Sequence, residues 1–171
     1  MKTRVVFDCM IFLQAVARPV GPAGACVDRA ENGDAELLVS ADILAEMRDV
    51  LNRPGVQKKF RNLTPERVAN FIIRIERFAV VIGPVPEAFT LARYPKDSKY
   101  LNLAIVSGAE LVVSRDNDLL DLMTSDDAEP TAFRTAYPTI RIIDPVAFLR
   151  TFPPTDSSKT DPTTANPDEA L

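Results

Sequence analysis

Hydrophobic residues follow two alternating patterns along this chain, namely short continuous apolar runs and longer segments with helical spacing. The short runs are rich in β-branched and aromatic residues, which is typical of buried strands. These runs predict strands at residues 4–7, 37–39, 79–82, 111–113 and 141–143. The longer segments repeat their apolar positions every three to four residues and therefore predict helices. These helices are expected at residues 11–17, 25–31, 41–51, 65–78, 98–108, 117–123 and 145–150.

Polar and helix-breaking residues mark several of the boundaries. Ser40 and Thr64 are good N-caps for the helices that follow them, and Pro65 stands at a first helical position, where proline needs no amide partner. Pro54 and Gly55 are expected to end the helix that follows Ser40. Residues 124–138 are polar, and we expect them to be irregular.

Helices that alternate regularly with short apolar strands predict an α/β domain, a three-layer α/β/α sandwich with a central parallel sheet. We expect one such domain over residues 1–152. Residues 153–171 are rich in Pro, Thr, Ser and Asp and are expected to form a disordered tail. In sheets of this kind, ligands bind beyond the carboxyl ends of the strands, near the point where the strand order reverses.

The chain contains no histidine, and this absence excludes several kinds of chemistry. Ser-His-Asp triads, Cys-His nucleophiles and histidine-bound zinc all require that residue. Cys9 and Cys26 have no zinc-like spacing and are expected to be reduced thiols. No apolar run approaches the roughly 18 residues of a membrane span, so we expect a cytoplasmic protein with no membrane partner.

Net charge gives little guidance about partners. The formal net charge is −4, but segment 153–171 holds four acids and one lysine, so the remainder carries a charge of about −1. A local basic patch would be sufficient for binding a nucleic acid, whatever the total.

Acidic residues stand at positions where strands end and helices begin. Asp8 follows the first apolar run, Asp97 precedes a helix, and Asp116 follows the fourth strand with Asp118 close behind it. Glu46 is the acid nearest to the apolar stripe of its helix. Four acids gathered in a chain without histidine would form an oxygen-only site for Mg²⁺ or Mn²⁺.

Each acid also has a simpler structural interpretation. Asp97 and Asp116 are well placed to cap helices, Glu46 to be a solvated helix residue, and Asp8 to end a strand through a local turn bond. The metal-site hypothesis therefore depends on whether the four side chains come together in space.

Four stretches, in order, resemble the PIN-domain family, especially its VapC-like ribonucleases, the toxins of bacterial and archaeal toxin–antitoxin systems. The stretches are VVFD, ILAEMRDVLNRP, PKDSKYLNLAIVSGAELVVSRDNDLL and IIDPVAFL. The resemblance runs from about Arg4 to Leu149 and implies Asp8, Glu46, Asp97 and Asp116 as the four acids. It also implies Ser114 as a supporting hydroxyl, and we add Asp118 as a second supporting residue. One departure is that Cys9 and Met10 stand where the family usually has threonine and then asparagine or serine.

The resemblance implies hydrolysis of RNA by a metal-activated water, leaving a 5′ phosphate. Asp8 and Asp116 would be direct ligands of Mg²⁺ or Mn²⁺, and Glu46 and Asp97 further ligands or acceptors for waters around the ion. Basic residues near the acids in sequence are candidates for binding the substrate: Arg18, Arg53, Lys96, Lys99 and Arg115. The cluster of Lys58, Lys59 and Arg61 is a weaker candidate, since most charged runs are solvated faces. A small antitoxin protein and a second copy of the chain are the implied partners.

Two other interpretations remain open at this point. A catalytically weak or inactive module that binds RNA or a partner is favoured by Cys9 and Met10 and disfavoured by the four acids. A phosphotransfer or dehalogenase-like enzyme with Asp8 as nucleophile would require a second aspartate two positions on, where this chain has Met10. Dinucleotide binding is disfavoured because no G-x-G-x-x-G follows the first strand.

Overall fold

A parallel five-stranded sheet forms the centre of the protein, which is described for residues 1–154 by a computed structural model. The strand order is β3-β2-β1-β4-β5, and every neighbouring pair is parallel. The strands are β1 (Arg4–Phe7), β2 (Glu36–Ser40), β3 (Val80–Ile82), β4 (Leu111–Val113) and β5 (Arg141–Ile143). The tail predicted over residues 153–171 lies, apart from its first two residues, outside the described residues.

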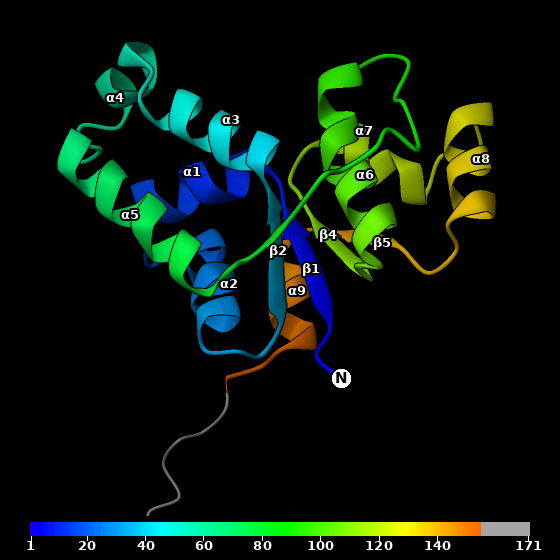
Figure 1. Ribbon diagram of the computed structural model, residues 1–171, viewed down its shortest axis with the longest axis horizontal. Helices are drawn as coiled ribbons and strands as arrows, with labels where there is room; N and C mark the ends of the chain where they lie inside the picture. The colour runs from blue at the N-terminus through cyan, green and yellow to red at the C-terminus, as the bar shows by residue number, and fades with distance from the viewer. Residues whose placement is uncertain (155–171) are drawn as a thin grey trace, which may run out of the picture.

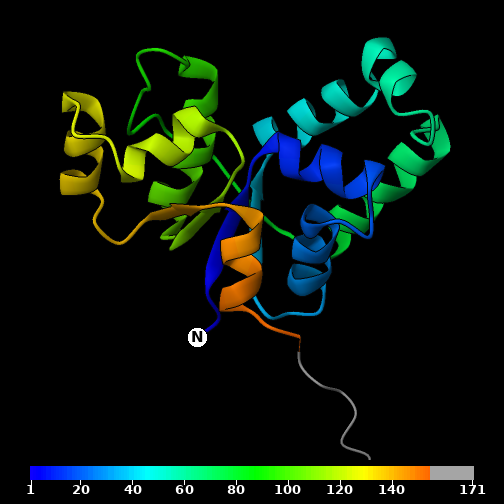
Figure 2. The same ribbon diagram turned by 180° about the vertical axis from the view of Figure 1, so that it is seen from behind.

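Helices cover both faces of this sheet, so the predicted three-layer α/β/α arrangement is confirmed (Figures 1 and 2). Helix α6 packs against β1, β2 and β4 on one face, and α2 and α9 pack against each other on the opposite face. The helices before the crossover are α1 (Cys9–Ala17), α2 (Pro22–Glu31), α3 (Ala41–Leu51), α4 (Pro54–Lys59) and α5 (Pro65–Phe78). Those after it are α6 (Ser98–Ser107), α7 (Asn117–Leu120), α8 (Ala128–Ala136) and α9 (Pro145–Thr151). Short 3₁₀ turns lie at η1 (Pro95–Asp97) and η2 (Asp121–Met123).

The order of the strands reverses between β1 and β4. The chain builds outwards from β1 through β2 to β3, then crosses back over residues 83–97 and builds outwards again from β4 to β5 (Figure 1). Phe7 pairs with Val113, and the Asp8 N–H donates to the Val113 carbonyl at 3.1 Å. Asp8 and Ser114 therefore leave the sheet side by side at the point where ligands bind in such folds.

Side-chain caps and prolines start most of the helices, as the sequence predicts for two of them. The hydroxyls of Ser40 and Thr64 accept from the N–H groups of Ile43 and Arg67, at 3.2 Å in each case. Each such cap satisfies a helix N–H that has no partner within the helix.

Three predictions about helices require correction. Residues 124–138 are not irregular, because α8 lies within them and buries Phe133 against Phe89 and Tyr137. Pro54 and Gly55 do follow the end of α3, but they also begin α4. Two helices start before the predicted residue. Helix α1 starts at Cys9 because Asp8 caps it, and α2 starts at Pro22 because this proline occupies the first helical position.

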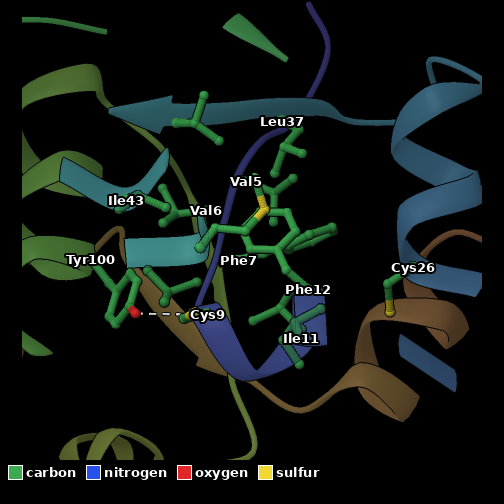
Figure 3. Packing of buried hydrophobic residues seen from close by; sticks show 14 of the residues in the cluster. Val5, Val6, Phe7, Cys9, Ile11, Phe12, Cys26, Leu37, Ile43 and Tyr100 are labelled. Carbon is green, nitrogen blue, oxygen red and sulfur yellow. Dashed lines mark hydrogen bonds between the residues drawn. The ribbon is translucent and has the colours of Figure 1, made fainter. Parts of the chain in front are cut away.

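The core is continuous and reaches the last helix. Phe7 is fully buried and contacts Phe12 of α1 and Phe148 of α9, with ring centroids 6.0 and 5.6 Å apart (Figure 3 labels Phe7 and Phe12). Helix α9 is therefore part of the domain core.

Within residues 1–154, no single helix is long and apolar enough to cross a membrane. Helices α1 and α2 reach the required length and apolar character only as a pair, and this pair is bent by 103°.

We predict that Phe148→Ala destabilises the protein by about 3 to 5 kcal/mol, because it leaves a cavity beside Phe7. Urea unfolding followed by circular dichroism would measure this loss. Val146→Ala on the same helix is the matched control, since Val146 is exposed and its loss should cost within about 0.5 kcal/mol. Equal effects from the two substitutions would contradict the assignment of α9 to the core.

Candidate functional site

One cleft at the carboxyl ends of the strands brings the four predicted acids together. Asp8, Glu46, Asp97 and Asp116 all line this cleft, which has a volume of about 530 Å³ and is called the acid cleft below. The acids come from four segments far apart in sequence: the ends of β1 and β4, helix α3, and the turn before α6. The metal-site hypothesis requires the four side chains to come together in space, and all four line the same cleft.

Asp8 is the most buried of the four acids, with 3% of its surface exposed. Its Oδ1 accepts from the Ile11 N–H at 3.0 Å, which makes Asp8 the N-cap of α1. Its Oδ2 accepts from the Ser114 hydroxyl. Asp8 thus has the local structural role considered from the sequence and also lines the acid cleft.

The pKa of Asp8 is raised to about 6, and burial is the largest cause. The hydrogen bonds from Ser114 and Ile11 oppose this rise, whereas the charges of Asp116 and Asp97 add to it. The charges of the neighbouring acids therefore add to the cost that burial imposes on the Asp8 carboxylate.

Ser114 joins Asp8 to Asp116. It is fully buried at the end of β4, and its Oγ donates to Asp8 while accepting from the Asp116 N–H at 2.9 Å. The Ser114 N–H donates to the Ile143 carbonyl of β5 at 3.0 Å, which fixes the residue between two strands. The predicted supporting hydroxyl therefore contacts one acid through its side chain and holds the backbone of another.

Asp116 also caps a helix, because its Oδ1 accepts from the Asp118 N–H at 2.9 Å. Asp118, predicted as a supporting residue, contributes this backbone N–H. Asp118 is not among the residues that line the acid cleft and instead lines a separate hollow that includes Asp121. The capping interpretation thus holds for Asp116 in addition to its place in the cleft.

Asp97 does not cap its helix. It precedes α6 without a side-chain capping bond, is half-buried, and faces the acid cleft. Burial raises its pKa, and the charges of Asp116 and Glu46 raise it further. The simpler capping role therefore does not account for this residue.

Glu46 is held by two partners from α6. Its Oε2 accepts from the Tyr100 hydroxyl and lies 3.1 Å from the Lys99 Nζ. The same Tyr100 oxygen accepts from the Cys9 N–H at 3.1 Å, which is the dashed line in Figure 3. Tyr100 thus connects the first turn of α1 to Glu46, and burial together with Glu46 raises the tyrosine pKa.

Sequence reasoning missed Tyr100. It falls in the apolar stripe of α6, where an aromatic residue is expected to be core, and Tyr100 is indeed buried. The usable indication was its hydroxyl, because a buried tyrosine usually finds a hydrogen-bond partner.

The carboxylates have the donor chemistry that a hard divalent cation requires. In the described part of the chain, no three acid or cysteine side chains lie as a ready-made group for a metal ion. Mg²⁺ needs no such group, since it usually keeps several waters and is bound through one or two carboxylates. The raised pKa values of Asp8 and Asp97 fit a site in which a cation would neutralise the acids.

The structure separates the five predicted basic residues. Arg53 lines the acid cleft and pairs with Asp49, and Lys99 pairs with Glu46. Lys96 and Lys99 line a different hollow beside Ser40. Arg18 and Arg115 line a hollow next to the acid cleft, together with Lys59 of α4.

The two departures from the resemblance differ in exposure. Cys9 is buried and unpaired, and burial raises its pKa to about 12, so its thiol stays protonated. Met10 is 47% exposed and lines the acid cleft. Met10 thus adds to the apolar part of the cleft lining, which also includes Leu13 and Val50.

Comparison with known proteins identifies the family to which the fold belongs. The family model described as PIN domain matches residues 4–118, which include all four acids. The chain therefore belongs to the PIN-domain family, whose members are typically metal-dependent nucleases. It is also 27% identical over 122 residues to an uncharacterized protein of Methanocaldococcus jannaschii, a match that covers 71% of this chain and 76% of that protein.

We predict that Asp8→Asn stabilises the metal-free protein at about pH 7.5 by roughly 1 to 3 kcal/mol. The folded pKa of about 6 lies above the usual value near 4, so the folded protein binds more protons than the unfolded chain between these values. Stability then falls as the pH rises through this window, and the full cost is present above about pH 6. Urea unfolding with EDTA would show the gain at about pH 7.5 and its loss near pH 4.

Asp126→Asn is the control for this pH experiment, because Asp126 is exposed on a loop. It should change stability little at either pH. If Asp8→Asn had the same effect at both pH values, burial of the Asp8 charge would not be the cause.

Proposed function

We propose that this protein is a divalent-metal-dependent ribonuclease that hydrolyses phosphodiester bonds in the acid cleft. The observation that carries the proposal is the convergence of four acids on one cleft, with the pKa of Asp8 raised by burial and by its acidic neighbours. A cluster of this kind at the strand-order switch is suited to a hard cation and an anionic substrate. The raised pKa alone has a structural explanation, so the shared cleft is the stronger support.

Asp8 and Asp116 are the proposed direct ligands of Mg²⁺ or Mn²⁺, with Glu46 and Asp97 as ligands or acceptors for surrounding waters. A bound divalent ion supplies Lewis-acid polarisation of the phosphoryl oxygen and lowers the pKa of water. Ser114 supports both proposed ligands, because it donates to Asp8 and holds the Asp116 backbone. Tyr100 and Lys99 fix the direction in which Glu46 points.

Arg53 is the proposed cation for the scissile phosphate. It lines the acid cleft, and a guanidinium binds phosphate oxygens through a planar pair of N–H groups. Arg53 forms an exposed ion pair with Asp49, which lies four residues earlier on α3. An exposed pair of this kind contributes little to stability, so a phosphate could replace Asp49 as the partner of Arg53.

We predict that the wild-type protein cuts RNA only with Mg²⁺ or Mn²⁺, and that Asp8→Asn and Asp116→Asn each reduce the rate about 100-fold or more. The reason is that the ion contributes several kcal/mol of transition-state stabilisation, and about 1.4 kcal/mol corresponds to a factor of ten. A gel assay on mixed single-stranded and structured RNA would measure the cleavage.

Asp126→Asn should retain full activity, and circular dichroism should show that all the variants are folded. Equal activity in wild type and the two acid variants would refute the proposal.

A second candidate function, a catalytically weak module that binds RNA or a partner, is favoured by Cys9 and Met10 in the cleft wall. That module would show no cleavage and little thermal stabilisation by Mg²⁺ or Mn²⁺.

We predict that Tyr100→Phe raises the Mg²⁺ concentration needed for half-maximal cleavage by about 10- to 100-fold, as expected when a partner of a metal-site residue is removed. The substitution keeps the ring but removes the hydroxyl that joins the Cys9 N–H to Glu46. Titration of the cleavage rate with Mg²⁺ would measure the shift. Tyr137→Phe, at an exposed hydroxyl 3.4 Å from the Ala88 carbonyl, is the matched control. A lower rate with an unchanged Mg²⁺ midpoint would assign Tyr100 a purely structural role.

The resemblance to toxins further leads us to propose that the protein acts in the cytoplasm as the toxin of a toxin–antitoxin pair. A small antitoxin protein would block the acid cleft, and two copies of the chain would form a homodimer. Co-expression with the protein encoded by a neighbouring gene, followed by the cleavage assay, tests the inhibition.

A further inference from the structure

Next to the acid cleft lies a second hollow of opposite charge, with a volume of about 230 Å³. Its charged lining consists of Arg18, Lys59 and Arg115, and we call it the basic hollow. Gln14 and Phe60, together with Lys59, line both cavities. The basic hollow is therefore a continuation of the acid cleft along α1, towards the start of α2.

The three cations of the basic hollow have no carboxylate partner within residues 1–154. By contrast, Arg53 and Lys99, which border the acids, are both paired. Three like charges around one cavity repel one another, and an anion in the cavity would relieve this repulsion. The acid cleft on its own repels a polyanion, so a neighbouring cationic surface is needed to hold one there.

Packing fixes both walls of the basic hollow. The Asn62 side-chain amide donates to the Ala17 carbonyl at 2.8 Å, which ties the segment after Lys59 and Phe60 to the end of α1. On the other wall, a Cβ at Gly24 would overlap the Pro19 carbonyl oxygen. The loop that carries Arg18 therefore packs directly on the backbone of α2, at a distance that only glycine allows.

We propose that the basic hollow binds a backbone phosphate of single-stranded RNA next to the phosphodiester in the acid cleft. This inference rests on the proposed ribonuclease function. A cationic groove that follows the backbone is the usual way in which single strands are held. The adjacent hollows provide such a path, because the strand passes from the acids over Gln14 and Phe60 to the three cations.

The test is binding of fluorescent oligouridylate to the full-length chain in EDTA, where no cleavage is expected, followed by fluorescence anisotropy over a range of salt concentrations. The variant replaces Arg18, Lys59 and Arg115 with glutamine. We expect its affinity at about 50 mM salt to fall roughly tenfold or more. A plot of log affinity against log salt has a negative slope. We also expect this slope to become shallower by about 0.7 for each phosphate that the variant no longer neutralises.

The matched control replaces Arg77, Arg141 and Arg150 with glutamine, which removes the same charge from exposed positions outside both cavities. It should keep nearly the wild-type affinity. Equal weakening in the two triple variants would overturn the proposal, as would a wild-type protein that binds no single-stranded RNA. Tighter binding to a base-paired hairpin than to oligouridylate would also overturn it.

The cleavage assay separates this inference from the proposed function. If the wild type cuts RNA and the hollow variant cuts it with an unchanged KM, the basic hollow is not a subsite and the ribonuclease proposal survives. If no cleavage occurs but the hollow variant alone loses binding, the phosphate subsite survives and the protein is a binding module. Circular dichroism of both triple variants confirms that each is folded.

Discussion

The hydrogen bond from the Ser114 hydroxyl to the Asp8 carboxylate joins the ends of β1 and β4, the two strands between which the sheet reverses its order. Both residues are buried, and each is fixed by the backbone of the next strand in the sheet. Because Ser114 also accepts from the Asp116 N–H, one hydroxyl sets the position of two acids. The arrangement of the acid cleft therefore follows from the parallel register of the central strands.

A buried carboxylate beside other carboxylates reduces stability, and its persistence needs a physical reason. Asp8 caps α1, but an exposed aspartate would do so without the cost of burial. The raised pKa values of Asp8 and Asp97 have the same two causes, burial and acidic neighbours. Burial of these acids lowers the free energy of unfolding, as is common at functional sites. A bound cation would raise it again in part.

The sheet could be predicted from sequence because each strand is a short apolar run, and Asp8 stood out because it follows such a run directly. Helix α8 could not be predicted from the sequence, because it is largely polar and is held in place by Phe133. Phe133 packs on Phe89, which lies in a distant segment of the chain. Tyr100 was missed for a similar reason, as only the structure places its hydroxyl between Cys9 and Glu46. Proximity in sequence does not by itself place a side chain in the cleft, since Lys96 is the direct neighbour of Asp97 but lines the hollow beside Ser40.

Charge is segregated between the two adjoining cavities and is only partly paired. Three of the acids lie at strand ends or beside the start of α6, and Glu46 lies on α3. The three cations of the basic hollow lie on α4 and on connecting segments. Within residues 1–154 these cations form no ion pair with the acids. Lys59 instead lies over the Phe60 ring, 5.5 Å from its centroid, at the boundary between the two cavities. The surface thus places an acidic cavity next to a basic one, which is the charge pattern that a metal-dependent reaction on a polyanion would require.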